Sequence, residues 1–531
     1  MTKKVLISDK LSEAGLEILE KAQGIQTDSK PGLSPEELKA IIGEYDALVI
    51  RSGTTVTADI LEAATRLKLV GRAGIGVDNV DVASASKHGV IVENTPSGNA
   101  VTTAEHALAM LFAVSRMIPQ ATMSMKAGKW EKKQFMGREL CNKVLGVVGV
   151  GNIGKIVANR ALGLKMRVLG FDPFLTPEAA SKMGIELVSL EEIFKQSDYI
   201  TTHVPLNDKT RGLINADSFA KMKDGVFIIN CARGGIVDEE ALLQALNSGK
   251  VAGAGLDVFV KEPPEANSPL VQHPKVVCTP HLGASTDEAQ VNVAVEVAQQ
   301  VVDYLQRGEI RNAINFPSLS GELAKVLKPY SKLAEALGKL LGHYAEGTPK
   351  EIHLEFAGEI KEYPLGSLTA AALKGFLQTH LSEEGQVNYV NAPFLAKERG
   401  ISVKEIKVSE AKGYTNLLQF KVLSDQGEHR VSGTVFGTEH PRLIRLDDFY
   451  LEAEPKGCLL MVKNQDKPGV IGKIGTTLGE RNINISRMHL GLNAKAGEAL
   501  AVYSLDSEPN QDLICALESL EHVLWVKVVL L

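Results

Sequence analysis

The sequence predicts an α/β protein with two doubly wound lobes, followed by an α+β unit and a C-terminal βαββαβ unit. Three observations lead to this prediction. Short apolar runs alternate with helical stretches as far as about residue 280, the order typical of parallel sheets covered by helices. A glycine-rich turn at Gly149–Gly154 directly follows an apolar strand. Residues 457–531 run strand, helix, strand, strand, helix and strand.

Length and composition limit the class of protein. The chain has 531 residues, enough for about three or four domains. Apolar residues make up 44% and charged residues 23%, which excludes a disordered chain, a collagen and a disulfide scaffold. The net charge is −6 and no long basic run occurs, so nothing indicates nucleic-acid binding.

Cysteine usage indicates the compartment. The five cysteines are far apart, form no CxxC pair and are odd in number: Cys141, Cys231, Cys278, Cys458 and Cys515. This pattern favours a reducing compartment without a disulfide or metal framework, and we expect most of them to be buried small apolar residues. The N-terminus lacks an apolar signal region and no run of 18 apolar residues occurs, so we expect a cytoplasmic protein.

The two lobes are predicted from alternating strands and helices. In the first, strands are expected at 5–7, 47–51 and 67–71, with helices at 11–22 and 61–64. A long, Ala-rich apolar helix is expected at 102–116. Strands of the second lobe are expected at 143–149, 167–171, 199–203, 226–230, 253–256 and 275–278. A helix at 285–305, with Ser285 and Glu288 as a capping box, could return to the first lobe.

The C-terminal half divides at two places. Phe316–Gly321 contains Pro317, Ser318 and Ser320 and is expected to be a linker. Beyond it, helical and strand patterns mix without a catalytic motif. The last unit is expected to have strands at 459–463, 483–490, 499–504 and 523–530, with helices ending near residue 480 and starting at 511.

The glycine turn has the sequence G-x-G-x-x-G in a strand-turn-helix context, which makes the motif informative. Gly149 permits the tight turn, Gly151 lets the backbone approach a pyrophosphate, and Gly154 lets helix and strand pack closely. The next strand ends at Asp172, 18 residues after Gly154, where a carboxylate can bind the ribose hydroxyls and repel a 2′-phosphate. NAD is therefore favoured over NADP, and a glycine turn without a ligand is the weaker alternative.

Three polar residues follow successive strands of the second lobe. Arg233, Glu262 and His281 are each expected beyond a strand's carboxyl end, where α/β sheets bind ligands. Alcohol oxidation by hydride transfer needs a base for the hydroxyl proton and a cation for the substrate. His281 with Glu262 could take and return the proton. Singly, each residue also has a structural interpretation: an exposed loop His, a turn Glu, a surface ion pair.

Motifs in a fixed order carry a family resemblance. The first group is GVGNIG (149–154), Asp172, THVPL (202–206), NCARGGIVDE (230–239), LDVF (256–259), KEPP (261–264) and PHLGAST (280–286). With these motifs in order, the chain resembles the D-isomer-specific 2-hydroxyacid dehydrogenases over about residues 1–316, with two Rossmann-like lobes.

Further motifs narrow the resemblance. Three of them are RSGTTV (51–56), GRAGIGVDNVD (71–81) and NTPSGNAVTTAEH (94–106), which are similar to those of the D-3-phosphoglycerate dehydrogenases. The segment NQDKPGVIGKIGTTLGERNINIS (464–486) resembles an ACT regulatory domain. Residues 320–454 are similar to the intervening domain of the long-form enzymes.

The resemblance implies roles for individual residues. Arg233 would bind the substrate, His281 would be the acid/base and Glu262 would orient it. NAD would be held by Ile75, Gly149, Gly151, Asn152, Ile153, Gly154, Asp172, Val204, Cys231, Ala232, Arg233, Asp257, His281, Leu282, Gly283 and Ala284. No metal is expected. The domains would be 1–98 together with 286–316 for substrate, 99–285 for NAD, 320–454 intervening and 457–531 ACT.

The resemblance also implies the reaction and its regulation. The expected reaction is NAD-dependent oxidation of 3-phosphoglycerate to 3-phosphohydroxypyruvate, the first step of serine synthesis, by a homo-oligomer, a tetramer. Arg51 and Arg72 follow strands of the first lobe and could bind substrate, the alternative being a structural ion pair. L-Serine is the expected effector at Asn464, Asp466 and Asn484. Asn464 stands where some relatives carry His or Tyr, and a structural dimerisation role is the alternative for this module.

Two other functions fit parts of the pattern. A hydroxypyruvate or glyoxylate reductase would share the chemistry, but the long C-terminal region disfavours it. A dinucleotide-sensing regulator would use the same scaffold to bind partners. The presence of Arg233, Glu262 and His281 together disfavours a sensor, because a sensor needs no proton-transfer pair.

Overall fold

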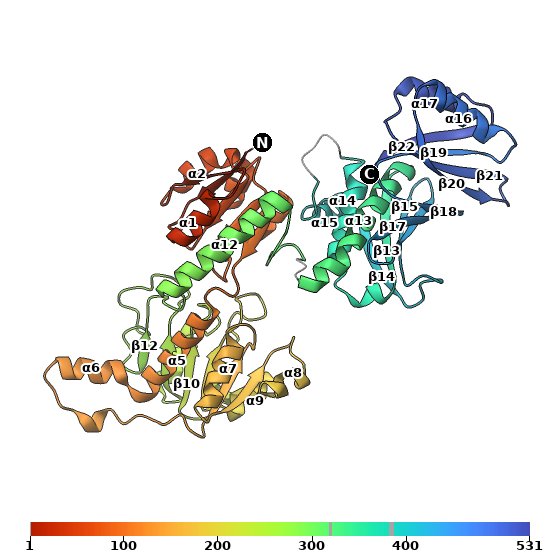
Figure 1. Ribbon diagram of the computed structural model, residues 1–531. Coiled ribbons are helices and arrows are strands. Elements are labelled where there is room, and N and C mark those ends of the chain that lie inside the picture. Colours follow the sequence, from red (N-terminus) through yellow and green to blue (C-terminus); the bar gives the residue numbers. More distant parts are fainter. Residues whose placement is uncertain (1, 318–320, 382–386) are drawn as a thin grey trace.

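The computed structural model describes residues 2–317, 321–381 and 387–531. In these residues the strands form four main sheets with helices packed against them (Figure 1). Residues 318–320 of the predicted linker lie outside the described residues. No helix in the described ranges is long and apolar enough to cross a lipid bilayer.

The first lobe is a five-stranded parallel sheet in the order β2-β1-β3-β4-β5. Most of its strands are apolar because helices cover both faces of the sheet, whereas the edge strand Ile25–Ser29 is largely polar. The strands are β1 (Lys3–Ile7), β2 (Ile25–Ser29), β3 (Ala47–Ile50), β4 (Leu69–Arg72) and β5 (Ile91–Asn94). The helices are α1 (Glu13–Glu20), α2 (Pro35–Ile41), η1 (Ile42–Glu44), α3 (Ala58–Ala63) and α4 (Val82–Lys87).

The second lobe is a seven-stranded parallel sheet in the order β12-β11-β10-β9-β6-β7-β8. The order reverses between β6 and β9, as in a doubly wound dinucleotide-binding fold. Its strands are β6 (Val144–Val148), β7 (Arg167–Phe171), β8 (Glu186–Leu187), β9 (Tyr199–Thr202), β10 (Val226–Asn230), β11 (Val251–Leu256) and β12 (Val276–Cys278). Its helices are α5 (Ala100–Arg116), α6 (Ile118–Lys126), η2 (Lys132–Gln134), α7 (Gly154–Gly163), α8 (Pro177–Lys182), α9 (Leu190–Gln196), α10 (Ala216–Lys221) and α11 (Glu239–Asn247).

Helix α12 (Asp287–Arg307) leaves the second lobe and packs on the first. Val297 and Val301 lie directly over Gly71 of β4, where an added Cβ would be 2.8 Å from Val297 Cγ2. The expected start of this helix was wrong. Its N-cap is Thr286, whose hydroxyl accepts a hydrogen bond from Ala289 N at 3.2 Å, while Ser285 N donates to Leu282 O in the preceding turn. Ser285 and Glu288 therefore form no capping box.

The intervening unit combines two long helices with a six-stranded sheet in the order β14-β13-β15-β16-β17-β18. Only the β13–β14 pair is parallel. The strands are β13 (Pro349–Gly358), β14 (Ser402–Val408), β15 (Asn416–Ser424), β16 (Glu428–Phe436), β17 (His440–Leu446) and β18 (Phe449–Ala453). The helices are α13 (Gly321–Tyr344), η3 (Glu359–Glu362), α14 (Gly366–Gln378) and α15 (Ala392–Glu398).

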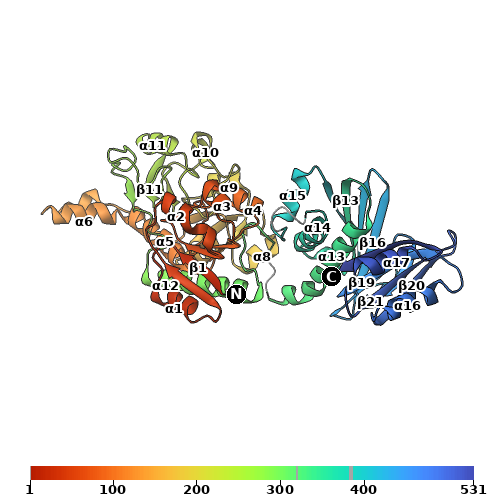
Figure 2. The same cartoon turned by 90° about the horizontal axis from the view of Figure 1, so that it is seen from above.

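The C-terminal unit confirms the expected βαββαβ order and forms an antiparallel sheet, β20-β21-β19-β22. Its elements are β19 (Cys458–Gln465), α16 (Val470–Glu480), β20 (Ile485–Asn493), β21 (Glu498–Leu505), α17 (Gln511–Glu518) and β22 (Val523–Leu530). One face of the sheet is covered by its two helices. The other face, including Leu459 and Met461, shares a buried apolar core with the intervening unit. Figure 2 shows the intervening unit and the C-terminal unit side by side, next to the two lobes.

The cysteines depart from expectation. Only Cys231 is buried, whereas Cys141, Cys278 and Cys515 are exposed and Cys458 is half-buried. Cys141 lies in a turn before β6, and Cys278 ends the edge strand β12. Edge and turn positions leave a small side chain partly in water, so the general tendency of cysteine to be buried does not hold there.

Candidate active site

The glycine turn joins β6 to α7, and two of its glycines, Gly149 and Gly154, leave no room for a side chain. Gly149 has φ +90°, a left-handed conformation that glycine adopts without strain. A Cβ on Gly154 would lie 1.9 Å from Gly149 O, so helix and strand pack as closely as the backbone permits. A Cβ on Gly151 would meet nothing within 4 Å. The turn is therefore tight at both ends and open in its middle.

The start of α7 and the end of β7 complete this edge of the sheet. No side chain caps α7 at its N-cap residue Ile153, so the positive end of the helix faces the turn without a side-chain acceptor and can attract an anion. Asp172 follows β7 and accepts hydrogen bonds from Val150 N at 2.9 Å and Phe174 N at 2.8 Å. An open glycine turn, uncapped N–H groups and a carboxylate beside them fit a dinucleotide.

Three neighbouring strands deliver the predicted catalytic residues to one edge. Asn230 of β10, Leu256 of β11 and Cys278 of β12 are partners in register. The segments that follow these residues carry Arg233, Glu262 and His281. Because the strands are parallel, all three segments leave the sheet on the side of the glycine turn.

His281 and Glu262 form a hydrogen-bonded pair. His281 Nδ1 lies 2.7 Å from Glu262 Oε2, and Glu262 Oε1 accepts from Phe259 N at 3.0 Å. His281 has φ +54°, and its backbone N–H donates to Asp257 O and Thr279 O, both at 3.0 Å. With Nδ1 engaged by the carboxylate and about half of the side chain exposed, Nε2 is the ring nitrogen available to a substrate hydroxyl.

Arg233 reaches from the second lobe to the first. Its Nε donates to Asp78 Oδ2 at 2.7 Å, and its Nη1 donates to Ala232 O at 2.7 Å. Nη2 lies against Gly76, where an added Cβ would be 1.6 Å away. The guanidinium thus lies between the two lobes.

Arg72, the last residue of β4, contributes a second half-buried guanidinium. Its Nε is buried without a hydrogen-bond partner among the described residues. Burial, followed by the positive charge of Arg233, lowers the pKa of Arg72 to about 10. A half-buried cation that keeps a buried, unpaired Nε, beside a second cation, favours an anionic ligand.

Arg51 follows β3, next to Arg72 in the sheet. Its backbone N–H donates to Asp9 Oδ2 at 2.6 Å, and its Nη1 donates to Lys10 O at 3.3 Å. The Arg51 side chain is therefore anchored to the loop after β1. Its charge also acts on the guanidinium of Arg72.

Asp257 anchors the loop that carries His281. Its carboxylate accepts hydrogen bonds from Thr279 Oγ1 at 2.6 Å, Leu282 N at 2.7 Å and Gly283 N at 2.8 Å, and His106 Nε2 lies 3.2 Å away. Burial raises the pKa of Asp257, but these hydrogen bonds, led by that of His106, outweigh it and hold the pKa below its usual value.

The other residues predicted to bind NAD surround the glycine turn and the strand ends. Val204 Cγ1 lies 2.7 Å from the Cβ position of Gly149. Asn152 is exposed in the turn, and Cys231 is buried directly after β10. Ile75, Ala232 and Ala284 are half-buried. Contacts of these residues with NAD stay predictions.

Several residues of the site were not predicted. Asp78, Asp9 and His106 are in or near motifs, but the sequence gives no sign of their partners. His203, within the THVPL motif, is packed beneath the glycine turn, since a Cβ on Gly149 would lie 2.6 Å from His203 O. Burial lowers the pKa of His203 to about 4, which favours the neutral ring at pH 7.

His106, Cys231 and Asp257 bring potential metal ligands within 4.8 Å of one another. His106 Nε2 lies 3.0 Å from Thr279 Oγ1, and the Asp257 oxygens accept the hydrogen bonds described above. Burial and the charge of Asp257 raise the pKa of the Cys231 thiol, which favours the protonated thiol, a poor metal ligand. We interpret this set as a hydrogen-bonded support for the His281 loop.

The predicted effector residues lie at two ends of the C-terminal sheet. Asn464 pairs with Ala499 at one end of β21, and Asp466 follows at that end, whereas Asn484 precedes Ile485, which pairs with Leu505 at the other end. Asn464 is buried, donates to Gln465 O at 2.7 Å and keeps Oδ1 without a partner in the described chain. Asp466 and Asn484 are exposed. Asn484 N donates to Asp506 Oδ1 at 3.2 Å. Within the described residues, no hydrogen bond connects the three side chains.

Three protein-family models match successive parts of the chain. The NAD-binding domain of D-isomer-specific 2-hydroxyacid dehydrogenases matches residues 108–283. The D-3-phosphoglycerate dehydrogenase intervening domain matches residues 326–447, and the ACT domain matches residues 459–522. The matches follow the order of the units in the structure.

Individual proteins extend the similarity to nearly the whole chain. A D-3-phosphoglycerate dehydrogenase of Synechocystis is 45% identical over 95% of this chain and 90% of its own length. One of Bacillus subtilis is 42% identical over 99% of both chains. A D-lactate dehydrogenase from Aquifex aeolicus, solved with NAD and lactic acid, is 27% identical, with a TM-score of 0.53 over 59% of this chain and all of its own. Because the similarity covers both lobes and both C-terminal units, the chain belongs to the D-3-phosphoglycerate dehydrogenase family.

Proposed function

We propose that the chain oxidises the C2 hydroxyl of 3-phospho-D-glycerate to 3-phosphohydroxypyruvate with NAD, the first step of serine synthesis. The observation that carries the proposal is the His281–Glu262 hydrogen bond of 2.7 Å at the strand edge that also bears the glycine turn. A base, a cation and a dinucleotide site on one edge are what hydride transfer from an alcohol requires.

His281 takes the hydroxyl proton on Nε2. Glu262 holds the ring by Nδ1 and stabilises the positive charge that the ring gains with the proton. Arg233 binds the carboxylate and carbonyl region of the substrate, which keeps the C2 hydroxyl within reach of Nε2. NAD, when bound, supplies the acceptor for the hydride. Gly149, Gly151, Gly154 and Asp172 would hold its pyrophosphate and ribose.

Arg72 and Arg51 bind the phosphate end of the substrate. Support comes from the buried, unpaired Nε of Arg72 and from the positions of both residues at adjacent strand ends. A guanidinium suits bidentate binding of a phosphate. On this proposal Arg72→Ala raises the KM for 3-phosphoglycerate at least tenfold. An unchanged KM would remove Arg72 from the substrate site.

The reaction is tested by NADH formation at alkaline pH with 3-phosphoglycerate, glycerate and lactate in parallel. The proposal expects turnover confined to 3-phosphoglycerate. Turnover of only the unphosphorylated acids would make the chain a reductase of a sister family. The variant His281→Asn distinguishes an enzyme from a dinucleotide-sensing regulator. If the chain is an enzyme, the variant should lose turnover by about 100-fold or more and still bind NAD. His88→Asn, at the exposed position directly after α4 (Val82–Lys87) of the first lobe, is the matched control.

We propose L-serine as the effector of the ACT domain. The unpartnered Asn464 Oδ1 can accept a hydrogen bond from an ammonium group, and Asp466 is exposed two residues further on. Asn484 lies at the other end of the same sheet, so on this proposal it would come from the second module of a pair. Serine is expected to reduce turnover, and Asn464→Leu, which removes the acceptor, to abolish that reduction while basal turnover is kept. Serine inhibition that persists in Asn464→Leu would exclude this site.

We propose that the chain assembles as a homo-oligomer, a tetramer, with α6 inserted against a second copy. This helix and η2 project away from the second lobe (Figure 2). The projecting segment exposes Met123, Met125, Trp130 and Met136, the last two by 80% or more, an apolar surface typical of an interface. Light scattering of Trp130→Glu with Met136→Glu is expected to give a smaller particle than the parent chain.

The proposed domain boundaries remain those expected from sequence: 1–98 with 286–316, 99–285, 320–454 and 457–531. The packing of α12 on α1 and β4 supports the return of the chain to the first lobe. The proposal also keeps the cytoplasmic location expected from the number and spacing of the cysteines. Limited proteolysis, with the fragments identified by mass spectrometry, tests these boundaries.

A further inference from the structure

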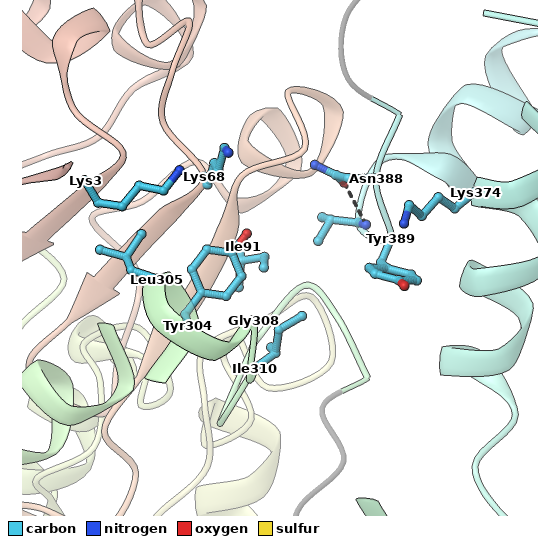
Figure 3. A pocket seen from close by; sticks show the side chains of 11 residues that line it. Lys3, Lys68, Ile91, Tyr304, Leu305, Gly308, Ile310, Lys374, Asn388 and Tyr389 are labelled. Atoms are coloured by element: carbon cyan, nitrogen blue, oxygen red, sulfur yellow. Dashed lines mark hydrogen bonds between the residues drawn. The ribbon is translucent and has the colours of Figure 1, made fainter. Parts of the chain in front are cut away.

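A cavity of about 410 Å³ lies between the first lobe and the intervening unit (Figure 3). Lys3 and Lys68 line it from the first lobe, and Lys374 and Tyr389 line it from the intervening unit. Tyr304, Leu305 and Ile310, in α12 and the segment after it, supply an apolar wall. Three ammonium groups around an apolar space distinguish this cavity from an ordinary gap between domains.

The first-lobe side of the cavity carries an excess of positive charge. Lys68 has no ion pair or side-chain hydrogen bond within the described ranges of the chain. Lys3 Nζ lies 3.7 Å from Asp46 Oδ1, and Arg66 Nη2 lies 3.1 Å from Asp46 Oδ2. One carboxylate thus serves two cations, and Lys68 adds a third. The Lys3 side chain is 35% exposed, so its ammonium remains accessible from the cavity.

The opposite wall is rigid. Lys374 Nζ pairs with Glu335 Oε1 at 2.6 Å and lies 4.2 Å from the centroid of the Tyr389 ring, whose hydroxyl donates to Glu335 Oε2 at 2.5 Å. Since Glu335 neutralises Lys374, the main attraction for an anion comes from Lys3 and Lys68. Lys374 and Tyr389 set the width of the cavity.

The two walls are fastened together next to the cavity. Asn388 Nδ2 donates to Gly89 O at 2.7 Å, and Val390 is 3% exposed within the apolar core of the first lobe. Lys87 Nζ pairs with Glu398 Oε1 at 3.5 Å. A ligand in the cavity therefore touches both sides of a formed interface and is expected to strengthen it.

We propose that this cavity binds a small organic acid, with its phosphate or carboxylate group on Lys3 and Lys68 and its hydrocarbon part against Tyr304, Leu305 and Ile310. The cavity is distinct from the active site. Lys3 begins β1 and Lys68 immediately precedes β4, whereas Arg72 ends β4. The anion site thus lies at the amino ends of the parallel strands and the substrate site at their carboxyl ends.

The test is hydrogen–deuterium exchange of the full chain with three probes at millimolar concentration: inorganic phosphate, phosphoglycolate and butanoate. The readout is slower exchange in residues 304–310 and 387–391, which active-site binding does not contact. Response to phosphate and phosphoglycolate alone assigns a phosphate group, and response to butanoate as well assigns a carboxylate; either supports the proposal. Lys68→Met is expected to weaken binding about tenfold.

Two further variants keep the test decisive. Lys39→Met removes an exposed lysine of α2 in the same lobe and should leave the response unchanged. Ile310→Trp fills the cavity while all three lysines stay, and should abolish the response even if Lys68→Met proves unstable. The proposal is overturned if no probe slows exchange in the two segments, or if the response persists in both Lys68→Met and Ile310→Trp.

Discussion

Arg233 of the second lobe donates through Nε to Asp78 Oδ2 of the first lobe at 2.7 Å. Nη1 of Arg233 donates to Ala232 O. Nη2 lies against Gly76 and makes no hydrogen bond to another residue that the structure describes. Asp78 therefore fixes the direction in which the remaining N–H groups of Arg233 face the space between the lobes. A charge-assisted hydrogen bond of this kind orients a guanidinium for bidentate binding.

Asp78→Asn is expected to raise the KM for 3-phosphoglycerate about tenfold and to change kcat less. The amide keeps the shape but loses the charge that holds Arg233, and hydrogen bonds to charged groups contribute about 1.5–3 kcal/mol. Initial-rate measurements over a range of substrate concentrations provide the test. Asp59→Asn, an exposed residue in the first turn of α3, is the matched control. A lower KM in Asp78→Asn would instead mean that Asp78 competes with the substrate carboxylate.

Two alanine substitutions in the glycine turn should distinguish an effect on NAD binding from an effect on the stability of the fold. A methyl group on Gly151 meets no protein atom within 4 Å, so Gly151→Ala is expected to keep thermal stability and to weaken NAD binding at least tenfold, because the methyl group enters the space of the pyrophosphate. A methyl group on Gly154 collides with Gly149 O, so Gly154→Ala is expected to lose about 1–3 kcal/mol of stability as well.

NADH fluorescence titration and thermal unfolding measure the two effects. Gly163→Ala is the control, because Gly163 is the last residue of α7 and an added Cβ there meets nothing within 4 Å. Its NAD affinity should equal that of the parent chain. Equal NAD affinity in Gly151→Ala would show that the pyrophosphate does not approach the middle of the turn.

Most strands of the two lobes were predictable because parallel strands covered on both faces read as continuous apolar runs. Strands β2, β5 and β8 were not predicted; β2 (IQTDS) is largely polar and β8 has only two residues. The predicted strands at 167–171 and 226–230 agree with β7 and β10 at both ends. The start of α12 was not predictable in the same way. The residue that caps the helix depends on the backbone conformation of Thr286, and Ser285 with Glu288 carries the same local signature.

The His281–Glu262 pair was predictable because both residues follow neighbouring strands of one sheet. Asp78 was not, since its partner Arg233 is 155 positions away in another lobe. The contact exists only through the packing of the lobes, which periodicity does not encode. The cavity at Lys68 has the same origin, because its walls come from units separated by about 300 residues of sequence.

Asp172→Ala is expected to relax the choice of cofactor. The carboxylate at the end of β7 repels a 2′-phosphate, so its removal should raise the ratio of kcat/KM for NADP to that for NAD at least tenfold. Asp172 also accepts from Val150 N and Phe174 N, so Asp172→Asn, which keeps an acceptor oxygen, controls for loss of loop structure. A ratio that stays unchanged in both variants would place the ribose away from Asp172.

Glu93, near the end of β5, is expected to make the stability of the first lobe depend on pH. The side chain is fully buried, and Oε1 accepts a hydrogen bond from Arg311 N at 2.7 Å. Burial raises the pKa of Glu93 from 4.5 to about 8, and the hydrogen bond and charge of Arg311 offset only part of that shift. The unfolded chain therefore releases this proton at lower pH than the folded chain. The stability that the protonated group contributes is complete below about pH 4.5 and is lost as pH rises toward 8.

Glu93→Gln should remove this dependence, because the amide stays neutral and keeps an acceptor for Arg311 N. The measurement is hydrogen exchange of the amides of Ile91–Asn94, corrected for intrinsic rates, at pH 5 and at pH 8. Between these two pH values the free energy of protection in the parent chain should fall by on the order of 2 kcal/mol more than it does in Glu93→Gln. Glu309→Gln is the control. Hydrogen bonds from Arg311 hold the pKa of Glu309 below its usual value, so that group does not titrate in this window. Parallel pH profiles for the parent chain and Glu93→Gln would mean that Glu93 is already ionised in the folded lobe at pH 5.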